Sequence, residues 1–181
     1  MVHPATPRGA AALLFVLVLC AGCGSSGSSK TSAKSYVKSV CSAISPLERD
    51  VVTRSSALNN ATATDATQAK KTLQGFLLAV AADSEHALSR IRSAGTPDIS
   101  GGKTVANTIV KAFTELRDAM RVATTKSNSL PTNSAASFKT AAQALGNSVK
   151  GSLNNIDASG LSNPELEKAA SNEPACKSLN S

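Results

Sequence analysis

Tryptophan is missing from this chain, and its 181 residues include one tyrosine and four phenylalanines. Histidine and acidic residues are also few, two and 12 respectively, and they are scattered along the sequence. With so few imidazole and carboxylate groups, the chain has few candidate ligands for a metal site and few candidates for a pair of acid–base catalysts. With aromatic side chains this scarce, the core must be built from Leu, Val, Ile and Ala. Such a core suits closely packed helices.

Long hydrophobic runs are also absent, apart from one at the N-terminus that extends from Ala10 to Leu19. It is about half as long as the roughly 20 residues that a bilayer span requires, and Arg8 supplies a positive charge before it. A short apolar run behind a positive charge predicts an export signal. Residues 1–22 are therefore left out of the expected fold.

The sequence Cys20-Ala21-Gly22-Cys23 resembles a bacterial lipobox, in which the last cysteine receives diacylglycerol and becomes the new N-terminus. The resemblance implies lipidation of Cys23. It departs from the pattern at Cys20, where leucine is usual; cleavage before Cys20 is disfavoured because bulky Leu19 would lie at the cut site. The alternative is ordinary secretion with release. The Gly/Ser-rich stretch at 23–34 favours an anchor, since a lipoprotein needs a flexible tether there.

Two cysteines then remain, Cys41 and Cys176. An even pair in an exported chain predicts one disulfide bond. Their wide separation differs from the Cys-x-x-Cys spacing of a redox pair, so we expect a structural bridge.

From Cys23 onward the chain has 18 Lys and Arg against 12 Asp and Glu, a net charge of +6. A moderately basic surface suits a protein beside anionic lipid or anionic wall polymers. Nucleic acid is a poor partner for this chain, because its basic residues are spread out and no aromatic residues interleave with them. The export signal would also carry the protein out of the compartment that holds the genome.

Four segments carry apolar residues at helical spacing, and a fifth, shorter helix is predicted by Asn163-Pro164-Glu165. The expected ranges are about 33–59, 65–95, 102–125, 134–158 and 163–172. Ser45-Pro46-Leu47-Glu48 has the form of a capping box with proline at the first helical position, which predicts a kink or restart at Ser45.

Four amphipathic helices with short polar loops predict an all-α fold, an up-down-up-down four-helix bundle over residues 35–181. In this topology the start of the first helix and the C-terminal tail lie at one end, so a Cys41–Cys176 bridge would hold the tail and the short last helix there. The opposite end, with loops at 60–64 and 126–133, would face away from the membrane.

Each long helix carries one aromatic residue: Tyr36, Phe76, Phe113 and Phe138. They could form an aromatic layer around a ligand, but ordinary core packing explains them more simply.

Two local motifs are set aside. Ser100-Gly101-Gly102-Lys103-Thr104 contains the Gly-Lys-Thr of a phosphate-binding loop, but Pro97 stands where its first glycine is required. Asp83 and His86 are three residues apart and can share a helix face, yet two ligands are too few for a structural zinc site. We therefore expect no catalytic residue, no metal and no cofactor, and a protein that is not an enzyme.

The two ends of the chain resemble the small helical surface lipoproteins of actinobacteria, including mycobacteria and streptomycetes. The similarity rests on Ala21–Ser26, on the segment from Tyr36 to Cys41 and on Pro174–Leu179. It implies a location on the outer face of the cell membrane and a helical fold, and it implies no activity.

These observations favour a lipid-anchored, non-enzymatic binding or interaction module at the cell envelope, with an envelope protein or an anionic wall polymer as its partner. The alternative is a carrier of a small molecule or lipid in a cavity inside the bundle. An exposed apolar patch of several hundred Å² would favour the first; an enclosed pocket of about 300 Å³ or more would favour the second, and a solid core would exclude it. A hydrolase or transferase would require convergent polar residues with perturbed pKa values.

Overall fold

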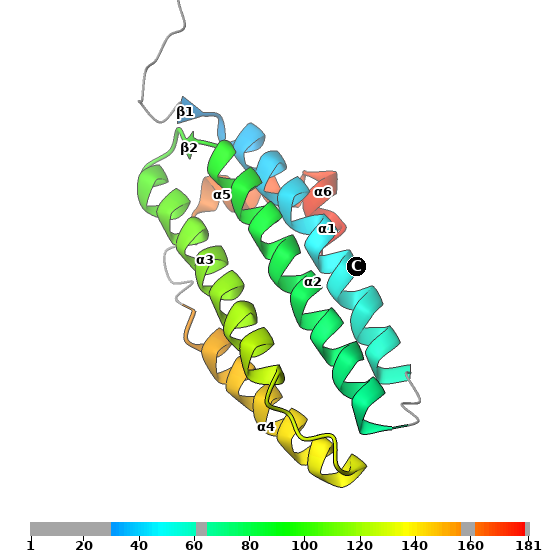
Figure 1. Cartoon of the computed structure of the whole chain (residues 1–181). Helices are drawn as coiled ribbons and strands as arrows, with labels where there is room; N and C mark the ends of the chain where they lie inside the picture. The colour runs from blue at the N-terminus through cyan, green and yellow to red at the C-terminus, as the bar shows by residue number, and fades with distance from the viewer. Residues whose placement is uncertain (1–29, 61–64, 157–161, 180–181) are drawn as a thin grey trace, which may run out of the picture.

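The computed structural model describes residues 30–60, 65–156 and 162–179, which form six helices and one pair of short strands (Figure 1). The expected signal peptide, Cys23 and Ala158 lie outside these residues. The elements are β1 (Lys30–Thr31), α1 (Ala33–Asn60), α2 (Ala66–Ser93), β2 (Thr96–Pro97), α3 (Gly102–Ser127), α4 (Ala135–Asn154), α5 (Pro164–Ser171) and α6 (Pro174–Lys177).

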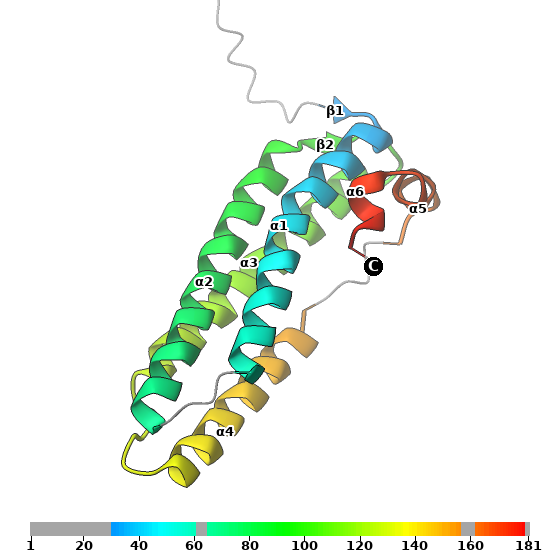
Figure 2. The same ribbon diagram turned by 90° about the vertical axis from the view of Figure 1, so that its right-hand side faces the viewer.

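The predicted all-α bundle is confirmed, and α2 lies at its centre. Helices α1 and α3 both pack against α2, while α4 packs against α3 and, over a shorter stretch, against α2. Helices α5 and α6 pack against the first half of α1. Figure 2 shows the result: α4 covers the lower half of one side of the molecule, and α5 with α6 covers the upper half.

Local signals position the helix ends much as the sequence predicts. Asp65 caps α2, accepting a hydrogen bond from the backbone N–H of Gln68 at 2.8 Å. Gly95 follows α2 with a φ of 77°, a left-handed conformation that glycine adopts without strain. Asn163 caps α5, and its side chain accepts from the N–H groups of Glu165 and Leu166.

Of the kink or restart predicted at Ser45, the restart is wrong, because α1 continues through Pro46. The Ser45 hydroxyl does not cap a new helix; it donates to the carbonyl of Cys41 at 2.9 Å. Val40 and Leu47 are both buried, two turns apart on either side of the proline. Packing on both sides therefore keeps α1 a single helix, despite the hydrogen bond that proline removes.

Helix α4 is shorter than expected and ends at Asn154 rather than near Ala158. Two successive asparagines, Asn154 and Asn155, stand at this end, and asparagine is a weak helix former. Because α4 stops early, it covers only the lower part of the bundle.

A parallel pairing of β1 with β2 at the upper end was not predicted from the sequence. Lys30 lies opposite Thr96 and Thr31 opposite Pro97, and the N–H of Asp98 donates to the carbonyl of Thr31 at 2.7 Å. Residues 30–34 of the expected tether thus lie in β1, its link to α1 and the first turn of α1.

The glycine pair before α3 has a steric role. Gly101 has a φ of 71°, and a Cβ on Gly102 would overlap the carbonyl oxygen of Pro97. The two glycines let α3 start directly beneath β2.

The predicted disulfide joins Cys41 of α1 to Cys176 of α6, across 135 residues of sequence. Ser45 adds a hydrogen bond to the carbonyl of Ala175 at 3.3 Å. The C-terminal tail is therefore attached to the first half of α1, the end at which the bundle topology predicts it.

Candidate functional site: an apolar crevice inside the bundle

An apolar crevice with a volume of about 460 Å³ runs between α1 and α4, and we call it the α1–α4 crevice. Among the long helices, α1 packs most closely against α2, while α4 packs mainly against α3. Four helices contribute thirteen lining residues: Leu47 and Val51; Leu73, Phe76, Leu77 and Val80; Leu116 and Met120; Ala142, Leu145, Gly146, Val149 and Leu153.

The residues that line this crevice can make only apolar contacts through their side chains. None of the thirteen side chains carries a charge or a hydrogen-bonding nitrogen or oxygen atom. Five of them, Leu47, Leu77, Val80, Met120 and Leu145, belong to the buried core. The crevice is therefore the open side of the hydrophobic core.

The crevice is elongated along α4. Its lining on that helix extends from Ala142 to Leu153, which at 1.5 Å per residue is about 16 Å. The crevice is a half-open groove rather than an enclosed cavity.

Gly146 is one of the walls of the crevice on α4. A Cβ placed on it would meet no atom within 4 Å, and the same holds for Gly151 on the same helix. Gly151 does not line the crevice. The two glycines thus offer a matched pair of positions, one inside the crevice and one outside it.

The lower end of the crevice continues into a wider and more polar hollow of about 790 Å³. The two spaces share Leu73 and Ala142. Asp65, Lys139 and Gln143 add polar groups to its lining. This lower mouth connects the apolar interior with water.

A second apolar cavity, of about 310 Å³, lies at the upper end between α1, α3 and α5. Ile44 of α1 and Phe113 of α3 line it, each one helical turn from a residue of the α1–α4 crevice, Leu47 and Leu116. Tyr36 also lines it, so we call it the Tyr36 cavity. Burial raises the pKa of Tyr36 to about 12.

The four aromatic residues of the helices do not form one layer. Tyr36 and Phe113 line the Tyr36 cavity, Phe76 lines the crevice, and Phe138 lines the lower mouth. They follow one another along the same apolar interior.

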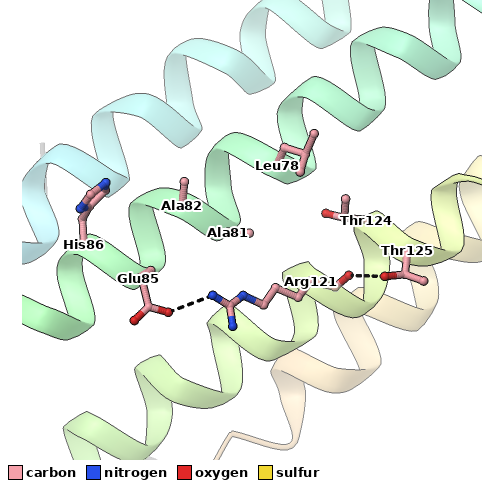
Figure 3. A pocket seen from close by; sticks show the side chains of 8 residues that line it. All are labelled: Leu78, Ala81, Ala82, Glu85, His86, Arg121, Thr124 and Thr125. Carbon is pink, nitrogen blue, oxygen red and sulfur yellow. Dashed lines mark hydrogen bonds and ion pairs between the residues drawn. The ribbon is translucent and has the colours of Figure 1, made fainter.

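A shallow hollow of about 500 Å³ lies on the other side of the bundle, between α2 and α3 (Figure 3). Its charged groups are paired across the two helices, since Glu85 accepts hydrogen bonds from Arg117 and Arg121, each at 3.2 Å. Asp118, and then Glu85, raises the pKa of Arg117. These ion pairs hold α3 to α2.

Asp83 and His86 do not form a site together. Asp83 instead interacts with Asp50 across the α1–α2 contact. Arg54 lowers the pKa of Asp50, whereas burial, and then Asp50, raises that of Asp83. His86 is exposed. The part of the chain that the structure describes holds no group of three or more His, Cys, Asp or Glu suited to a metal ion.

The loop that joins α3 to α4, within the expected partner-binding region 126–133, is tied to α2. The Lys70 ammonium donates to the carbonyls of Asn128 and Leu130 at 2.8 and 3.0 Å, and Gln74 donates to the Asn128 side chain at 2.9 Å. Most of the other expected loop, residues 61–64, lies outside the described residues.

A cavity inside the bundle was one of the two alternatives drawn from the sequence, but its position between α1 and α4 was not predicted, although one signal for it is present. Helix α4 carries mostly small residues at its centre, among them Ala141, Ala142, Ala144 and Gly146. Small side chains on a helix that must cover a core leave space unfilled.

None of the helices over residues 30–60, 65–156 and 162–179 has the length and apolarity that crossing a membrane requires. No protein-family model matches the chain, and no curated protein or solved structure matches it.

Proposed function

We propose that the protein is a lipid-anchored extracytoplasmic binding protein that holds the acyl chain of a lipid in the α1–α4 crevice. The observation that supports this most directly is the lining of the crevice: thirteen residues without a single polar side-chain N or O. Apolar surface in contact with water is unfavourable, and an acyl chain would cover it. The crevice is also above the lower limit of typical ligand pockets, about 300 Å³.

The chemistry of the crevice suits an acyl chain. Its lining offers no hydrogen-bonding side-chain atom along about 16 Å of α4, and a hydrocarbon chain needs no hydrogen bonds.

The proposed location fits this ligand. An acylated Cys23 would hold the bundle on the membrane, and the six residues between Cys23 and β1, treated as a flexible coil, would reach roughly 13 Å. The protein would then remain close to a bilayer that supplies acyl chains. The basic surface, with a net charge of +6 after the signal, would favour anionic lipid. We propose no catalytic group, metal or cofactor for this function.

The alternative, an interaction module for an envelope protein or wall polymer, has weaker support from the geometry. The large hydrophobic side chains that are most exposed, Val52, Leu78 and Val122, belong to three different helices. Singly exposed apolar residues are normal on soluble domains.

The crevice can be tested by filling it. The Gly146→Leu variant places a side chain in the crevice, and Gly151→Leu places the same side chain outside it. Both variants are made in the chain that starts at residue 23 with Cys23→Ala, so that no covalent acyl group competes. The probe is the methyl ester of a long-chain fluorescent polyene fatty acid, and its fluorescence in the protein gives the Kd.

We expect Gly146→Leu to raise the Kd at least tenfold and Gly151→Leu to leave it unchanged. Both variants should be as stable as the parent or slightly more so, because leucine favours a helix over glycine by up to about 1 kcal/mol. Equal binding by the parent and Gly146→Leu, or no binding by the parent, would overturn the proposal.

A further inference from the structure

A polar hollow of about 370 Å³ lies between α1 and α2, near the end of the bundle that carries β1 (Figure 1). We call it the Lys38 hollow. Lys38 of α1 and Arg90 of α2 line it, and no acidic residue does. Two cations therefore border one space. The rest of its lining is small, namely Ala94 and the four serines Ser39, Ser42, Ser89 and Ser93.

The two cations of this hollow have no anionic partner in the described part of the chain. None of the ion pairs among the described residues includes Lys38 or Arg90. The hollow between α2 and α3 differs, since its Arg121 is paired with Glu85. Two like charges that share a space disfavour each other. An anion from outside the chain would pair with both.

The serine hydroxyls add neutral donors to the same space. Ser93 donates to the carbonyl of Ser89 at 3.1 Å, whereas the hydroxyl groups of Ser39, Ser42 and Ser89 form no hydrogen bond with the described residues. Arginine and lysine are the residues that bind phosphate most often. A phosphate group has more oxygen atoms than a carboxylate and can accept from the guanidinium, the ammonium and the hydroxyl groups together. The donor set therefore favours phosphate.

The chain around the hollow is basic as well. Residues 30–42 hold three lysines and residues 87–94 hold two arginines, and neither range has an acidic residue. Arg90 and Arg92 lie in the last turn of α2, where the helix dipole favours a cation. Lys34 lies in the first turn of α1, which has no acidic residue, and there the dipole disfavours a cation. Helix stability thus explains the arginines but not Lys34, which a nearby anion would compensate.

We propose that the Lys38 hollow binds the phosphate group of an anionic membrane lipid. The source follows from the place of the hollow in the fold. It lies at the same end as β1, the described element nearest to the expected anchor, and six residues separate Cys23 from β1. A lipid headgroup at the bilayer surface is therefore the nearest phosphate. This inference rests on the lipid anchor of the proposed function, but not on the α1–α4 crevice.

The test compares two double variants that remove the same charge from different ends of the molecule. Lys38→Gln with Arg90→Gln removes both cations of the hollow. Lys71→Gln with Lys150→Gln removes two lysines of the lower half (Figure 2). All four residues are exposed, so both variants should keep the thermal stability of the parent. The parent is the chain that starts at residue 23 with Cys23→Ala, because a covalent lipid would hold the protein on any membrane.

The probes are vesicles of a neutral glycolipid without phosphate. One set contains phosphatidylglycerol, and the other contains a diacylglycerol hemisuccinate, which supplies the same surface charge through a carboxylate. Flotation of the vesicles gives the fraction of bound protein. Glycerol phosphate, the soluble form of the same headgroup, is titrated into the protein and is also used as a competitor, against sodium chloride of equal ionic strength.

We expect the parent to bind the phosphatidylglycerol vesicles more tightly than the hemisuccinate vesicles, and glycerol phosphate to release it better than sodium chloride does. Lys38→Gln with Arg90→Gln should weaken binding to phosphatidylglycerol about tenfold or more and abolish the preference for phosphate. Lys71→Gln with Lys150→Gln should keep this preference and weaken binding by about twofold at most, because charges far from the surface are screened.

Three results would overturn the inference. Equal binding of the parent to the two sets of vesicles, or equal losses in the two double variants, would mean that net charge alone attracts the protein. Binding of soluble glycerol phosphate without binding to vesicles would mean that the phosphate does not come from a membrane lipid.

Gly146→Leu separates this inference from the proposed function, and we expect it to bind phosphatidylglycerol vesicles as the parent does. If it does not bind them, the contact with vesicles comes from the crevice and the inference fails. If it binds them and also keeps the Kd of the parent for the fluorescent ester, the proposed function fails and the phosphate site stands.

Discussion

Tyr36 and Gly146 contribute to the apolar interior in opposite ways. Tyr36 brings a polar atom into an environment that does not pair it, whereas Gly146 contributes space by having no side chain. Neither role can be inferred from residue type alone, because a tyrosine near a helix start and a glycine within a helix are both common. What gives them meaning is their surroundings in the folded chain.

The ionisation of Tyr36 can be followed directly, since this residue is the only tyrosine. Its pKa is raised from 10 to about 12 by burial, so the folded state holds its proton more tightly than the unfolded state does. Stability is therefore fully present below pH 10 and falls as the pH rises towards 12. We expect tyrosinate absorbance of the folded protein to titrate near 12, and that of the urea-unfolded chain near 10.

The comparison for this measurement is Tyr36→Phe, whose stability should not show the loss between pH 10 and pH 12. A folded-state titration at the ordinary value of 10 would contradict the burial of the hydroxyl.

At the scale of elements, α1 shows how tertiary packing overrides a local signal. Ser45 and Pro46 form a sequence that would start a helix, yet both lie within one. The ends of α2 and α5 follow their local signals, because nothing in the packing opposes Asp65 or Asn163 as a cap. Capping motifs therefore predict boundaries well where the flanking segments are not both anchored in the core.

The cost of this override is measurable with Pro46→Ala. Alanine restores the N–H that can donate to the carbonyl of Ser42 and removes the clash of the proline ring, a gain of about 3 kcal/mol for a helix interior. The unfolded chain gains up to about 1 kcal/mol of conformational freedom in return. We expect the free energy of unfolding to rise by about 2 kcal/mol in urea denaturation.

The control is Pro164→Ala at the first position of α5, where proline is well tolerated. This variant should show no gain. If Pro46→Ala also shows none, the helix accommodates its proline without strain and the argument from lost hydrogen bonding fails.

Whole-molecule features divide into those that the sequence predicts and one that it does not. The helices and the Cys41–Cys176 bridge were predictable, because apolar periodicity is local and only one cysteine pair remains after the lipobox. A cavity inside the bundle was an alternative, but the position of the crevice was not predictable, because periodicity shows which face of α4 is apolar but not which neighbour covers it. The small residues around Ala142 and Gly146 decide how much space is left, and that depends on where α1 lies.

The disulfide is the largest single contribution to stability that we expect. It closes a loop of 135 residues, for which the loop-entropy model gives about 5 kcal/mol as an upper value. Replacing both Cys41 and Cys176 with serine should lower the free energy of unfolding by about 2–5 kcal/mol in denaturant titrations. A soluble quencher should also reach Tyr36 more readily, because α5 and α6 are no longer tied to α1. Unchanged stability, with or without reductant, would contradict this.

The pairing of β1 with β2 acquires a mechanical meaning if Cys23 is anchored as proposed. In the part of the chain that the structure describes, which begins at Lys30, β1 is joined to β2 by strand pairing, by the hydrogen bond from Asp98 to Thr31 and by the ion pair between Lys30 and Asp98. A pull on the tether would load this small clamp before it reached the first turn of α1. The strand pair would thus bear the force first when the membrane fluctuates, and it would protect the first turns of the helix that carries Tyr36 and Cys41 from unfolding.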